Sequence, residues 1–273
     1  MNATKITRQS RSNLALAFVS LGRERRRDIT VFYAFCRLVD DIVDSSELDI
    51  EAKRSALAQW RGALRGPVAD EPSIAPAVRG LIDKYSLQPE MLDEIIVGVA
   101  MDLTVRRYET FEQLRVYCYG VASAVGLVSI EIFGYRNPAC KEYAVQLGLA
   151  LQMTNIIRDV ETDLLNNRIY LPLHDLARFD YSAADLQDRQ YDERFLQLMQ
   201  FEAARTHEFF DAAARLLPPE DRRSMVAAEI MASIYRGLLR RIERDGFRLF
   251  EKEYRLGKLE KARRIALQLL KSF

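Results

Sequence analysis

The sequence predicts an all-α protein, and three observations support this fold class. The chain is rich in Ala, Leu, Arg, Glu and Gln, which favour helices. Apolar residues recur at intervals of three and four, the spacing that places them on one face of a helix. Alternating runs of Val, Ile and Thr joined by Asn-Gly or Asp-Gly turns, which are typical of β-hairpins, are missing.

The eight prolines occur at a few places and leave long segments between them for helices, because proline interrupts a helix interior. The first two expected helices precede the loop that contains Pro67, Pro72 and Pro76. The third and fourth follow it and meet at Pro89, and Pro138 lies between the fifth and the sixth. The expected helices cover residues 24–45, 49–64, 73–85, 89–101, 111–134, 139–165, 192–216 and 220–250.

The length and composition indicate one domain. Hydrophobic residues make up 49% of the 273 residues and charged residues 29%, which is the usual balance of a globular protein and enough for an ordinary core. The loop at 66–76 separates segments that are too small to fold alone, and no internal repeat or shift in composition marks a boundary. We therefore expect a single domain over residues 1–273.

Charge and cysteine usage exclude several classes of protein. Forty basic and 39 acidic side chains give a net charge of +1, which removes the global electrostatic case for a nucleic-acid partner. The three cysteines, Cys36, Cys118 and Cys140, have no CxxC spacing, so we expect reduced thiols in the cytoplasm. The two histidines, His174 and His207, have no cluster of ligands around them, so a zinc site has little support.

The sequence gives no indication of a membrane span. We find no apolar run near the roughly 18 to 20 residues that cross a bilayer, and residues 1–20 are too polar for a signal peptide. The C-terminal segment 258–273 is basic on one side and apolar on another. That pattern is compatible with peripheral membrane contact, although we expect the apolar side to pack against the domain.

A polar stripe interrupts the first apolar helix. Tyr33, Arg37, Asp40 and Asp44 follow each other at spacings of four, three and four, which stacks them on one face. The neighbouring residues are largely apolar, so the arginine and the carboxylates border a side that should be buried. Asp41 lies beside the pair of aspartates and either assists them or faces solvent.

A second stripe of the same kind occurs far along the chain. Asn155, Asp159 and Asp163 follow at intervals of four, Arg158 lies three residues after Asn155, and Gln152 extends the stripe backwards. Each stripe alone could be a solvated helix face with ordinary polar pairs. Two helices that both present like charges at four-residue spacing, however, require a compensating cation.

The ligand chemistry of these stripes points to Mg²⁺. Hard oxygen donors without histidine or cysteine suit this ion, which takes only one or two carboxylates and completes its shell with water and phosphate oxygens. A diphosphate held between the two helices would meet that need.

The two stripes lie in segments that resemble the signature regions of the squalene and phytoene synthase family. The matching segments are Tyr33-Ala-Phe-Cys-Arg-Leu-Val-Asp-Asp-Ile-Val-Asp44, Gln152-Met-Thr-Asn-Ile-Ile-Arg-Asp-Val-Glu-Thr-Asp163, Asn167-Arg-Ile-Tyr-Leu-Pro172 and Tyr117-Cys-Tyr-Gly-Val-Ala-Ser-Ala-Val-Gly126. Two long motifs in the family's order make a chance match improbable. The similarity extends from about Ser12 to Gly246 and is greatest to bacterial hopanoid-pathway members.

The resemblance implies an isoprenoid synthase fold, in which helices surround a central apolar cavity and two aspartate-bearing helices face each other. It also implies Mg²⁺ as cofactor. Carried over by position, the metal ligands would be Asp40, Asp44, Asn155, Asp159 and Asp163. The four aspartates among them, together with Tyr33 and Tyr117, would be catalytic. Substrate would contact Arg37, Arg158, Tyr235, Gln152, Asn155, Ser12, Asn13 and Phe18.

The implied reaction is the head-to-head condensation of two farnesyl diphosphates to presqualene diphosphate, and to squalene where NADPH reduces it. Phytoene or dehydrosqualene synthesis is an alternative on the same machinery, with geranylgeranyl diphosphate as the substrate for phytoene. A prenyl diphosphate phosphatase and a non-enzymatic scaffold are two further alternatives. The family pattern departs at Leu173-His174-Asp175, where a basic residue often precedes the acidic one. The sequence leaves the oligomeric state open.

Overall fold

The computed structural model describes residues 17–271, and within this range its regular structure is helical apart from an isolated bridge between Arg107 and Ile169. The all-α prediction is therefore confirmed. The α-helices are α3 (Arg23–Asp44), α4 (Ile50–Arg65), α5 (Ala75–Tyr85), α6 (Pro89–Ala100), α7 (Phe111–Cys118), α8 (Ala124–Phe133), α9 (Cys140–Arg158), α10 (Val160–Leu165), α11 (Leu173–Arg178), α12 (Ala183–Gln187), α13 (Glu193–Leu216), α14 (Val226–Arg244) and α15 (Lys258–Lys271). Shorter turns are η1 (Phe18–Ser20), η2 (Met101–Leu103), the π-helical η3 (Tyr119–Ser123) and η4 (Pro219–Asp221).

Each expected helix has a counterpart, but two of them differ from the prediction. The helix expected over 139–165 breaks at Asp159, whose backbone leaves the helical region at φ −100° and ψ 12°. The helix expected over 220–250 covers only Val226–Arg244. It begins late because the buried Asp221 carboxylate accepts the backbone N–H groups of Arg136 and Asn137 at 2.8 and 2.9 Å, and it ends at a left-handed turn at 246–247.

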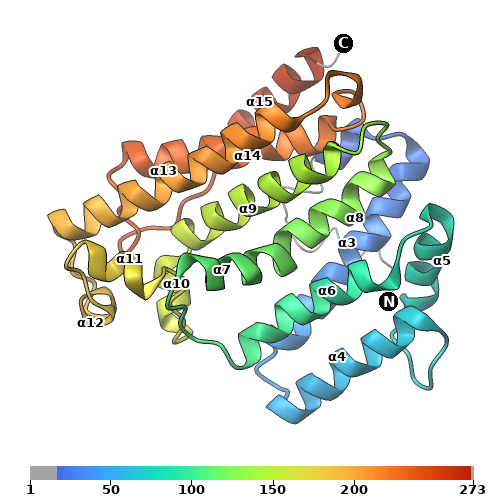
Figure 1. Cartoon of the computed structure of the whole chain (residues 1–273), viewed down its shortest axis with the longest axis horizontal. Helices are drawn as coiled ribbons and strands as arrows, with labels where there is room; N and C mark the ends of the chain where they lie inside the picture. Colours follow the sequence, from blue (N-terminus) through green and yellow to red (C-terminus); the bar gives the residue numbers. More distant parts are fainter. Residues whose placement is uncertain (1–16, 272–273) are drawn as a thin grey trace.

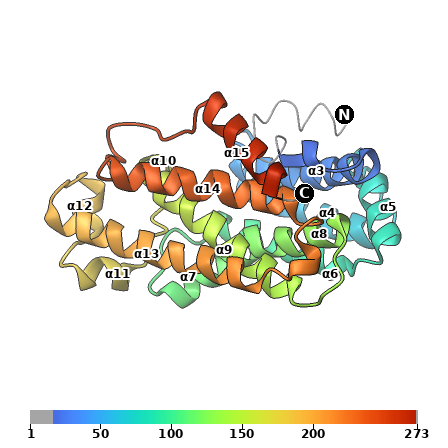
Figure 2. The same ribbon diagram turned by 90° about the horizontal axis from the view of Figure 1, so that it is seen from above.

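Helix α9 lies at the centre of the bundle (Figure 1). It packs against α13 and α14 on one side and against α7, η3 and α8 on the other. Helices α6, α3 and α4 continue the second side outward, and α15 lies at the outer edge next to α14, as the view from above also shows (Figure 2). The central position of α9 matters because its last turn carries the second polar stripe.

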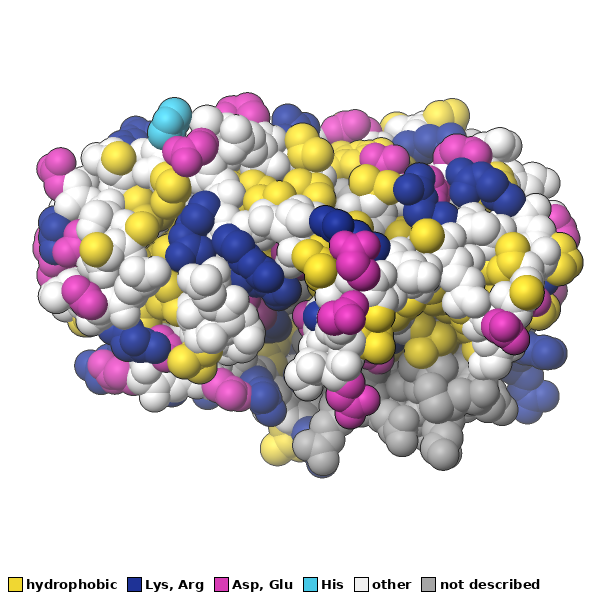
Figure 3. All heavy atoms as spheres, turned by 90° about the horizontal axis from the view of Figure 1, so that it is seen from below, with side chains coloured by type: hydrophobic (Ala, Val, Ile, Leu, Met, Phe, Trp, Pro, Cys, Tyr) yellow, Lys and Arg dark blue, Asp and Glu magenta, His cyan; other side chains and the backbone are white. Residues whose placement is uncertain are grey.

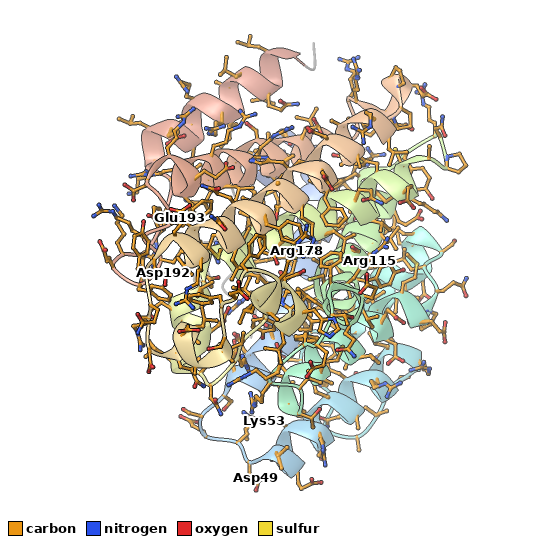
Figure 4. All side chains as sticks on the ribbon, turned by 60° about the vertical axis from the view of Figure 1, so that its left-hand side comes forward. Asp49, Lys53, Arg115, Arg178, Asp192 and Glu193 are labelled. Atoms are coloured by element: carbon orange, nitrogen blue, oxygen red, sulfur yellow. The ribbon has the colours of Figure 1, made fainter. Side chains whose placement is uncertain are left out.

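Side-chain caps fix where several helices begin. The Asp49 carboxylate accepts the N–H of Ala52 at 2.8 Å at the start of α4, and Lys53 Nζ donates to the Val43 carbonyl at 2.7 Å. The second bond ties the start of α4 to the last turn of α3, which bears the first polar stripe. Asp192 caps α13 by accepting the N–H of Phe195 at 3.1 Å. Figure 4 shows Asp49 and Lys53 at one end of α4 and Asp192 beside Glu193 at the start of α13.

The segment Phe111–Phe133 forms one bent helix from α7, η3 and α8. It is long and apolar enough to cross a membrane by length and composition, which the sequence analysis did not foresee, and it is the one such helix among the described residues. More than half of its apolar window, 56%, is buried inside the bundle, as is typical of the core helix of a globular domain. Its π-helical turn coincides with two close helix crossings.

Small residues allow these crossings. A Cβ atom added to Gly98 of α6 would lie 2.7 Å from the backbone of Gly120 in η3, and one added to Gly148 of α9 would lie 2.6 Å from Ser123 Cα. Two helices therefore touch the π-helical turn backbone to backbone, one on each side. The glycines serve close packing here, and Gly148 in addition lines the apolar pocket described below.

The three cysteines are free, in agreement with the expectation of reduced thiols. Cys118 and Cys140 are buried, and burial is the main cause that raises the pKa of Cys140 to about 12. These thiols therefore pack as small apolar side chains. The cytoplasmic location that they favour stays a prediction.

The crossing at η3 yields a test of the fold. Gly98→Ala should destabilise the protein by about 1 to 3 kcal/mol, because the new methyl group has no space next to the Gly120 backbone. Gly80→Ala is the matched control. Gly80 is an exposed helical glycine with nothing within 4 Å of an added Cβ, so alanine should stabilise α5 by about 0.5 to 1 kcal/mol. Urea denaturation measures both changes, and equal effects of the two substitutions would contradict the close crossing.

Candidate active site

The first polar stripe lies on roughly the last three turns of α3. Arg37 Nη1 donates to Asp40 Oδ2 at 2.8 Å, and its Nη2 donates to Asp41 Oδ1 at 2.7 Å. Asp44 is the last residue of the helix, and the partly buried Tyr33 lies one turn before Arg37. One guanidinium group is thus set among three closely spaced carboxylates.

The second stripe lies where α9 passes into α10. Arg158 binds the Asp159 carboxylate with both Nε, at 2.7 Å, and Nη2. The break at Asp159 separates the two helices, although the N–H of Asp163 still bonds to the Asp159 carbonyl at 2.8 Å. Gln152 accepts a hydrogen bond from Asn155 Nδ2 at 3.2 Å one turn earlier. This arrangement places Asn155, Asp159 and Asp163 about one turn apart around the break between α9 and α10.

Two contacts bring the stripes together as facing walls of one site. Arg168, which follows α10, lies with Nη1 at 3.8 Å from Asp44 Oδ1 of the first stripe. Tyr235 of α14 hydrogen-bonds to Arg158 and interacts electrostatically with Tyr33. The face drawn in Figure 3 is hollowed near its middle, with basic side chains gathered on one side of the hollow and acidic side chains on the other. Residues 33–44 and 155–168 therefore line one site, although more than 110 residues separate them.

Burial and the nearby carboxylates raise the pKa values of two aspartates in the site. Burial, followed by the negative charge of Asp44, raises the pKa of Asp40 to about 6 despite Arg37. Burial, followed by the charge of Asp159, raises the pKa of Asp163 to about 8 despite Arg168 and Arg158. The charge of Asp102 raises the pKa of both residues further. Burial and mutual repulsion therefore disfavour the charged form of these two carboxyl groups, and a bound cation would favour it again.

The donor set fits Mg²⁺, and a buried polar atom supports this. Asn155 Oδ1 is buried and has no hydrogen-bond partner among residues 17–271. A hard cation would give this amide oxygen a partner, and it would also be attracted to the neighbouring carboxylates. Within the same residues, no three His, Cys, Asp or Glu side chains converge closely enough to enclose a metal. Carboxylates on opposite walls leave coordination positions for phosphate oxygens and water, as Mg²⁺ requires.

A buried carboxylate that the sequence did not indicate lies beside the walls. Asp102 of η2 accepts hydrogen bonds from Tyr117 at 2.9 Å and from Tyr170 at 2.7 Å. The rings of Tyr117 and Tyr170 stack at 5.1 Å, and Tyr108 stacks on Tyr170 at 6.0 Å. Arg168, which the sequence did not indicate either, donates to the Asp102 carbonyl at 3.4 Å. In the sequence, the one sign of this site was a carboxylate directly after the apolar helix expected over 89–101. Its hydrogen-bond partners lie 15 and 68 residues away, so the spacing of neighbouring residues does not reveal them.

Backbone pairing holds the segment that carries Arg168 and Tyr170. The N–H of Ile169 donates to the Arg106 carbonyl at 3.0 Å, and the N–H of Leu173 donates to the Tyr108 carbonyl at 2.9 Å. The next residues, His174 and Asp175, belong to the stretch where the sequence departs from the family pattern. Asp175 contacts α13. There Arg205 donates to Asp175 at 2.7 Å and to the buried Glu202 at 2.9 Å. Asp175 thus anchors the segment to α13.

An apolar pocket lies beside the charged walls. Its volume is about 100 Å³, and side chains of η1, η3, α8, α9 and α14 line it. Of the residues that α9 contributes, Gly148 and Leu151 lie one to two turns before Asn155. The pocket also contains Phe18, whose ring meets the edge of Tyr33 at 6.2 Å. Apolar and ionic binding regions are therefore adjacent along one helix.

The structure brings together most of the site residues that the sequence predicts. The two walls contain Tyr33, Arg37, Asp40, Asp44, Gln152, Asn155, Arg158, Asp159, Asp163 and Tyr235. Tyr117 is buried and faces Asp102, and Phe18 lies in the apolar pocket. Ser12 and Asn13 lie outside the described residues. The catalytic and binding roles of these residues stay predictions.

An all-α bundle with two facing carboxylate-bearing helices and an adjoining apolar pocket has the fold of an isoprenoid synthase. The model of the squalene/phytoene synthase family matches residues 7–265. The chain therefore belongs to this family, whose members are prenyltransferases.

Curated relatives and solved structures agree with the family. The chain is 35% identical to a phytoene synthase of Arthrospira platensis over 90% of its length and 84% of that protein. It is 33% identical to the phytoene synthase of Mycobacterium tuberculosis over 98% and 89% of the two chains. A dehydrosqualene synthase structure matches with a TM-score of 0.88 and 26% identity over 99% and 96% of the chains. Squalene synthase HpnC from Alicyclobacillus acidocaldarius matches with a TM-score of 0.76 and 25% identity over 90% and 93%.

The carboxylates of the two walls predict how ligands affect stability. Mg²⁺ with inorganic pyrophosphate should raise the melting temperature by roughly 5 to 10 °C at ligand concentrations about 100-fold above Kd, because specific binding stabilises the folded state. Asp163→Asn should lose most of this increase, and Asp83→Asn, an exposed change on α5, should keep it. Differential scanning fluorimetry measures the shift. The same shift in the Asp163 variant and the wild type would contradict the assignment of this wall.

The anchor at α13 predicts a pH dependence of stability. Burial raises the pKa of Glu202 from 4.5 to about 8 although Arg205 opposes this. The folded protein thus binds this proton more tightly than the unfolded chain. The resulting stability is complete below about pH 4.5 and is lost as the pH rises to about 8. Glu202→Gln should reduce the fall in unfolding free energy across this window by roughly 1 to 3 kcal/mol.

Urea titrations between about pH 5 and 8 measure this fall. Glu208→Gln, an exposed change on the same helix, is the control and should leave the pH dependence as it is in the wild type. If Glu202→Gln also left it unchanged, Glu202 would not be the group that titrates.

Proposed function

We propose that the chain joins two allylic prenyl diphosphates head to head. The observation that carries this proposal is the convergence of two carboxylate stripes and three arginines beside an apolar pocket. Helix α9 contributes residues to the second stripe and to the pocket. A diphosphate group suits the charged walls, and a prenyl chain suits the pocket. Family membership supports the same reaction class.

The charged side chains have two tasks in this proposal. Asp40, Asp44, Asn155, Asp159 and Asp163 would hold Mg²⁺, which when bound neutralises the leaving diphosphate as a Lewis acid. Arg37 and Arg158 are paired with Asp40 and Asp159 in the protein alone. When those carboxylates engage a cation, both guanidinium groups are released toward the phosphate oxygens, to which arginine donates bidentately. Arg168, at the junction of the walls, supplies a third positive charge.

The aromatic side chains would protect and stabilise the carbocation that remains after the diphosphate leaves. The stacked rings of Tyr108, Tyr117 and Tyr170 lie next to Asp102. The negative charge of Asp102 raises the pKa of Asp40 on one wall and of Asp163 on the other. An aromatic face stabilises a nearby cation by about 0.5 to 2 kcal/mol without offering a strong nucleophile. By accepting both hydroxyl hydrogens, Asp102 keeps Tyr117 and Tyr170 in fixed orientations.

Two chain lengths are candidates for the substrate. Farnesyl diphosphate, with presqualene diphosphate and then squalene or dehydrosqualene as products, is supported by the two structural neighbours named dehydrosqualene synthase and squalene synthase. Geranylgeranyl diphosphate, with phytoene as product, is supported by the curated phytoene synthases at 33 to 35% identity. Both groups match 90% or more of the chain, and we place farnesyl diphosphate first because the segment from Tyr33 to Asp44 resembles bacterial hopanoid-pathway members. NADPH would be needed only for squalene.

Product analysis tests the proposal. The chain is incubated with each prenyl diphosphate and Mg²⁺, with and without NADPH, and the products are identified by mass spectrometry. A coupled product of twice the substrate's carbon number is expected, and its chain length selects between the two substrates. Release of the free prenyl alcohol alone would indicate a phosphatase. Recovery of both substrates unchanged would refute the transferase.

Single substitutions test the two walls. Asp40→Asn and Asp159→Asn should each lower turnover by at least about 100-fold while the helical content is retained, because each removes a charged ligand from one wall. Asp83→Asn on α5 is the control and should keep full turnover. Turnover close to that of the wild type in both wall variants would refute the metal-site assignment.

A further inference from the structure

The apolar pocket extends along α9 away from the charged walls. Tyr143, Leu147, Leu151 and Asn155 follow each other on α9 at four-residue spacing, which places them on one face, and the first three line the pocket. This face therefore leads from the oxygen donor Asn155 to the buried ring of Tyr143. The two residues are twelve positions apart, which is about 18 Å at 1.5 Å per residue.

Helix α8 follows the pocket in the opposite direction. A Cβ atom added to Gly126 would lie 3.0 Å from the Ala144 carbonyl oxygen, whereas Gly148, four residues further along α9, meets Ser123. The two helices are therefore antiparallel, and Phe133, the last residue of α8, lies toward the start of α9. Figure 1 shows the turn between them at the end of α9 that is opposite to α10.

Buried side chains close the end of the pocket that is farthest from the walls. Phe133 is 4% exposed, Tyr143 0% and Ala227 1%, and all three line the pocket. Ala227 lies in the first turn of α14, two turns before Tyr235, which hydrogen-bonds to Arg158 at the charged end. The end of α8 and the starts of α9 and α14 thus meet at the closed end.

Hydrogen bonds hold this closed end in place. The Tyr143 hydroxyl donates to Glu229 Oε1 of α14 at 2.8 Å, so the ring cannot turn aside without breaking that bond. The turn after Phe133 is tied to η4, because the Asp221 carboxylate accepts the N–H groups of residues 136 and 137 at 2.8 and 2.9 Å. These contacts fix the depth of the pocket.

This depth suits a farnesyl chain better than a geranylgeranyl chain. A fully extended chain advances about 1.2 Å per bond, so a farnesyl group spans about 13 Å and a geranylgeranyl group about 18 Å. The diphosphate occupies the space next to Asn155, and the carbon chain begins beyond it. A farnesyl chain then ends before the ring of Tyr143, whereas the last isoprene unit of a geranylgeranyl chain would overlap with it.

We propose that Phe133 and Tyr143 determine the length of the prenyl chain that the pocket accepts, with farnesyl admitted and geranylgeranyl excluded. The identity of the ligand as a prenyl diphosphate rests on the proposed function. The dependence of binding on chain length does not require that the bound ligand react. The length assignment and the proposed reaction can therefore fail separately.

Calorimetric titration with unreactive analogues tests the proposal. The probes are the S-thiolodiphosphates of geranyl, farnesyl and geranylgeranyl groups, each with Mg²⁺. The wild type should bind the farnesyl analogue at least about tenfold more tightly than the geranylgeranyl analogue, because the longer chain meets the closed end. Phe133→Ala should lower this ratio at least about tenfold, because it deepens the pocket. A partly unfolded preparation leaves the ratio of two affinities unchanged.

A second variant should act in the opposite direction. Ser129 lines the pocket one turn before Phe133 on α8 and is half-buried. Ser129→Phe should move the closed end about 6 Å toward the walls, roughly one isoprene unit. This variant should bind the geranyl analogue more tightly than the farnesyl analogue.

Phe195→Ala is the matched control. It removes a buried phenylalanine of α13 that is not part of the pocket, so it should lower the melting temperature and leave the affinity ratios as in the wild type.

Unchanged ratios in both Phe133→Ala and Ser129→Phe would overturn the length assignment, as would tighter binding of the geranylgeranyl analogue by the wild type. Shifted ratios without any coupled product in the turnover assay would support the length assignment and refute the proposed reaction. A coupled product with ratios that neither variant changes would do the reverse. Failure to bind any of the three analogues would refute both.

Discussion

Repulsion between carboxylates is the constraint on which the site depends. Asp40 and Asp44 lie in the last two turns of α3, and Asp159 directly follows the last residue of α9. The C-terminus of a helix carries partial negative charge, so carboxylates there oppose the helix dipole, and α3 has no basic residue in its last turn to offset this. Burial is the largest cause that raises the pKa values of Asp40 and Asp163, and the charge of a neighbouring aspartate is the second. Such an arrangement is stable only with cations between the walls, and the arginines supply part of that charge.

The rest of the fold keeps the two walls at a fixed separation. Backbone contacts at Gly98 with Gly120 and at Gly148 with Ser123 lock α6 and α9 against the π-helical turn, with no flexible side chain in between. On the other side, Asp102 joins the tyrosines of two distant segments, and the pairing of residues 106–108 with 169–173 holds Arg168 near Asp44. Rigid positioning matters because charged groups that could relax apart would lose their preference for a cation.

The sequence predicts those features that depend on local spacing. The helices follow from three- and four-residue periodicity, and both stripes, which contain Asp40 and Asp159, follow from side chains one turn apart. The roles predicted for these aspartates come from the resemblance to the family. It does not identify Asp102, Arg168 and Tyr170, because their contacts join segments 15 to 68 residues apart and no periodic pattern encodes them. The late start of α14 has the same cause. The Asp221 carboxylate accepts backbone N–H groups of residues 136–137, which lie 84 and 85 positions away. Local patterns thus give the elements and the candidate ligands, and long-range polar contacts determine how they are held.

Helix α9 also explains why ionic and apolar binding can be coupled in one substrate. Gly148 lines the apolar pocket and Asn155 lines the charged wall, seven residues later, which is about 10 Å along the axis at 1.5 Å per residue. The two residues lie two turns apart on nearly the same face, so a ligand along this face would meet apolar side chains at one end and oxygen donors at the other. A prenyl diphosphate has that polarity. Its orientation would then be set by a single rigid helix, with the reacting bond at the boundary between the two environments, where the leaving group enters the charged region and the carbon chain stays among apolar side chains.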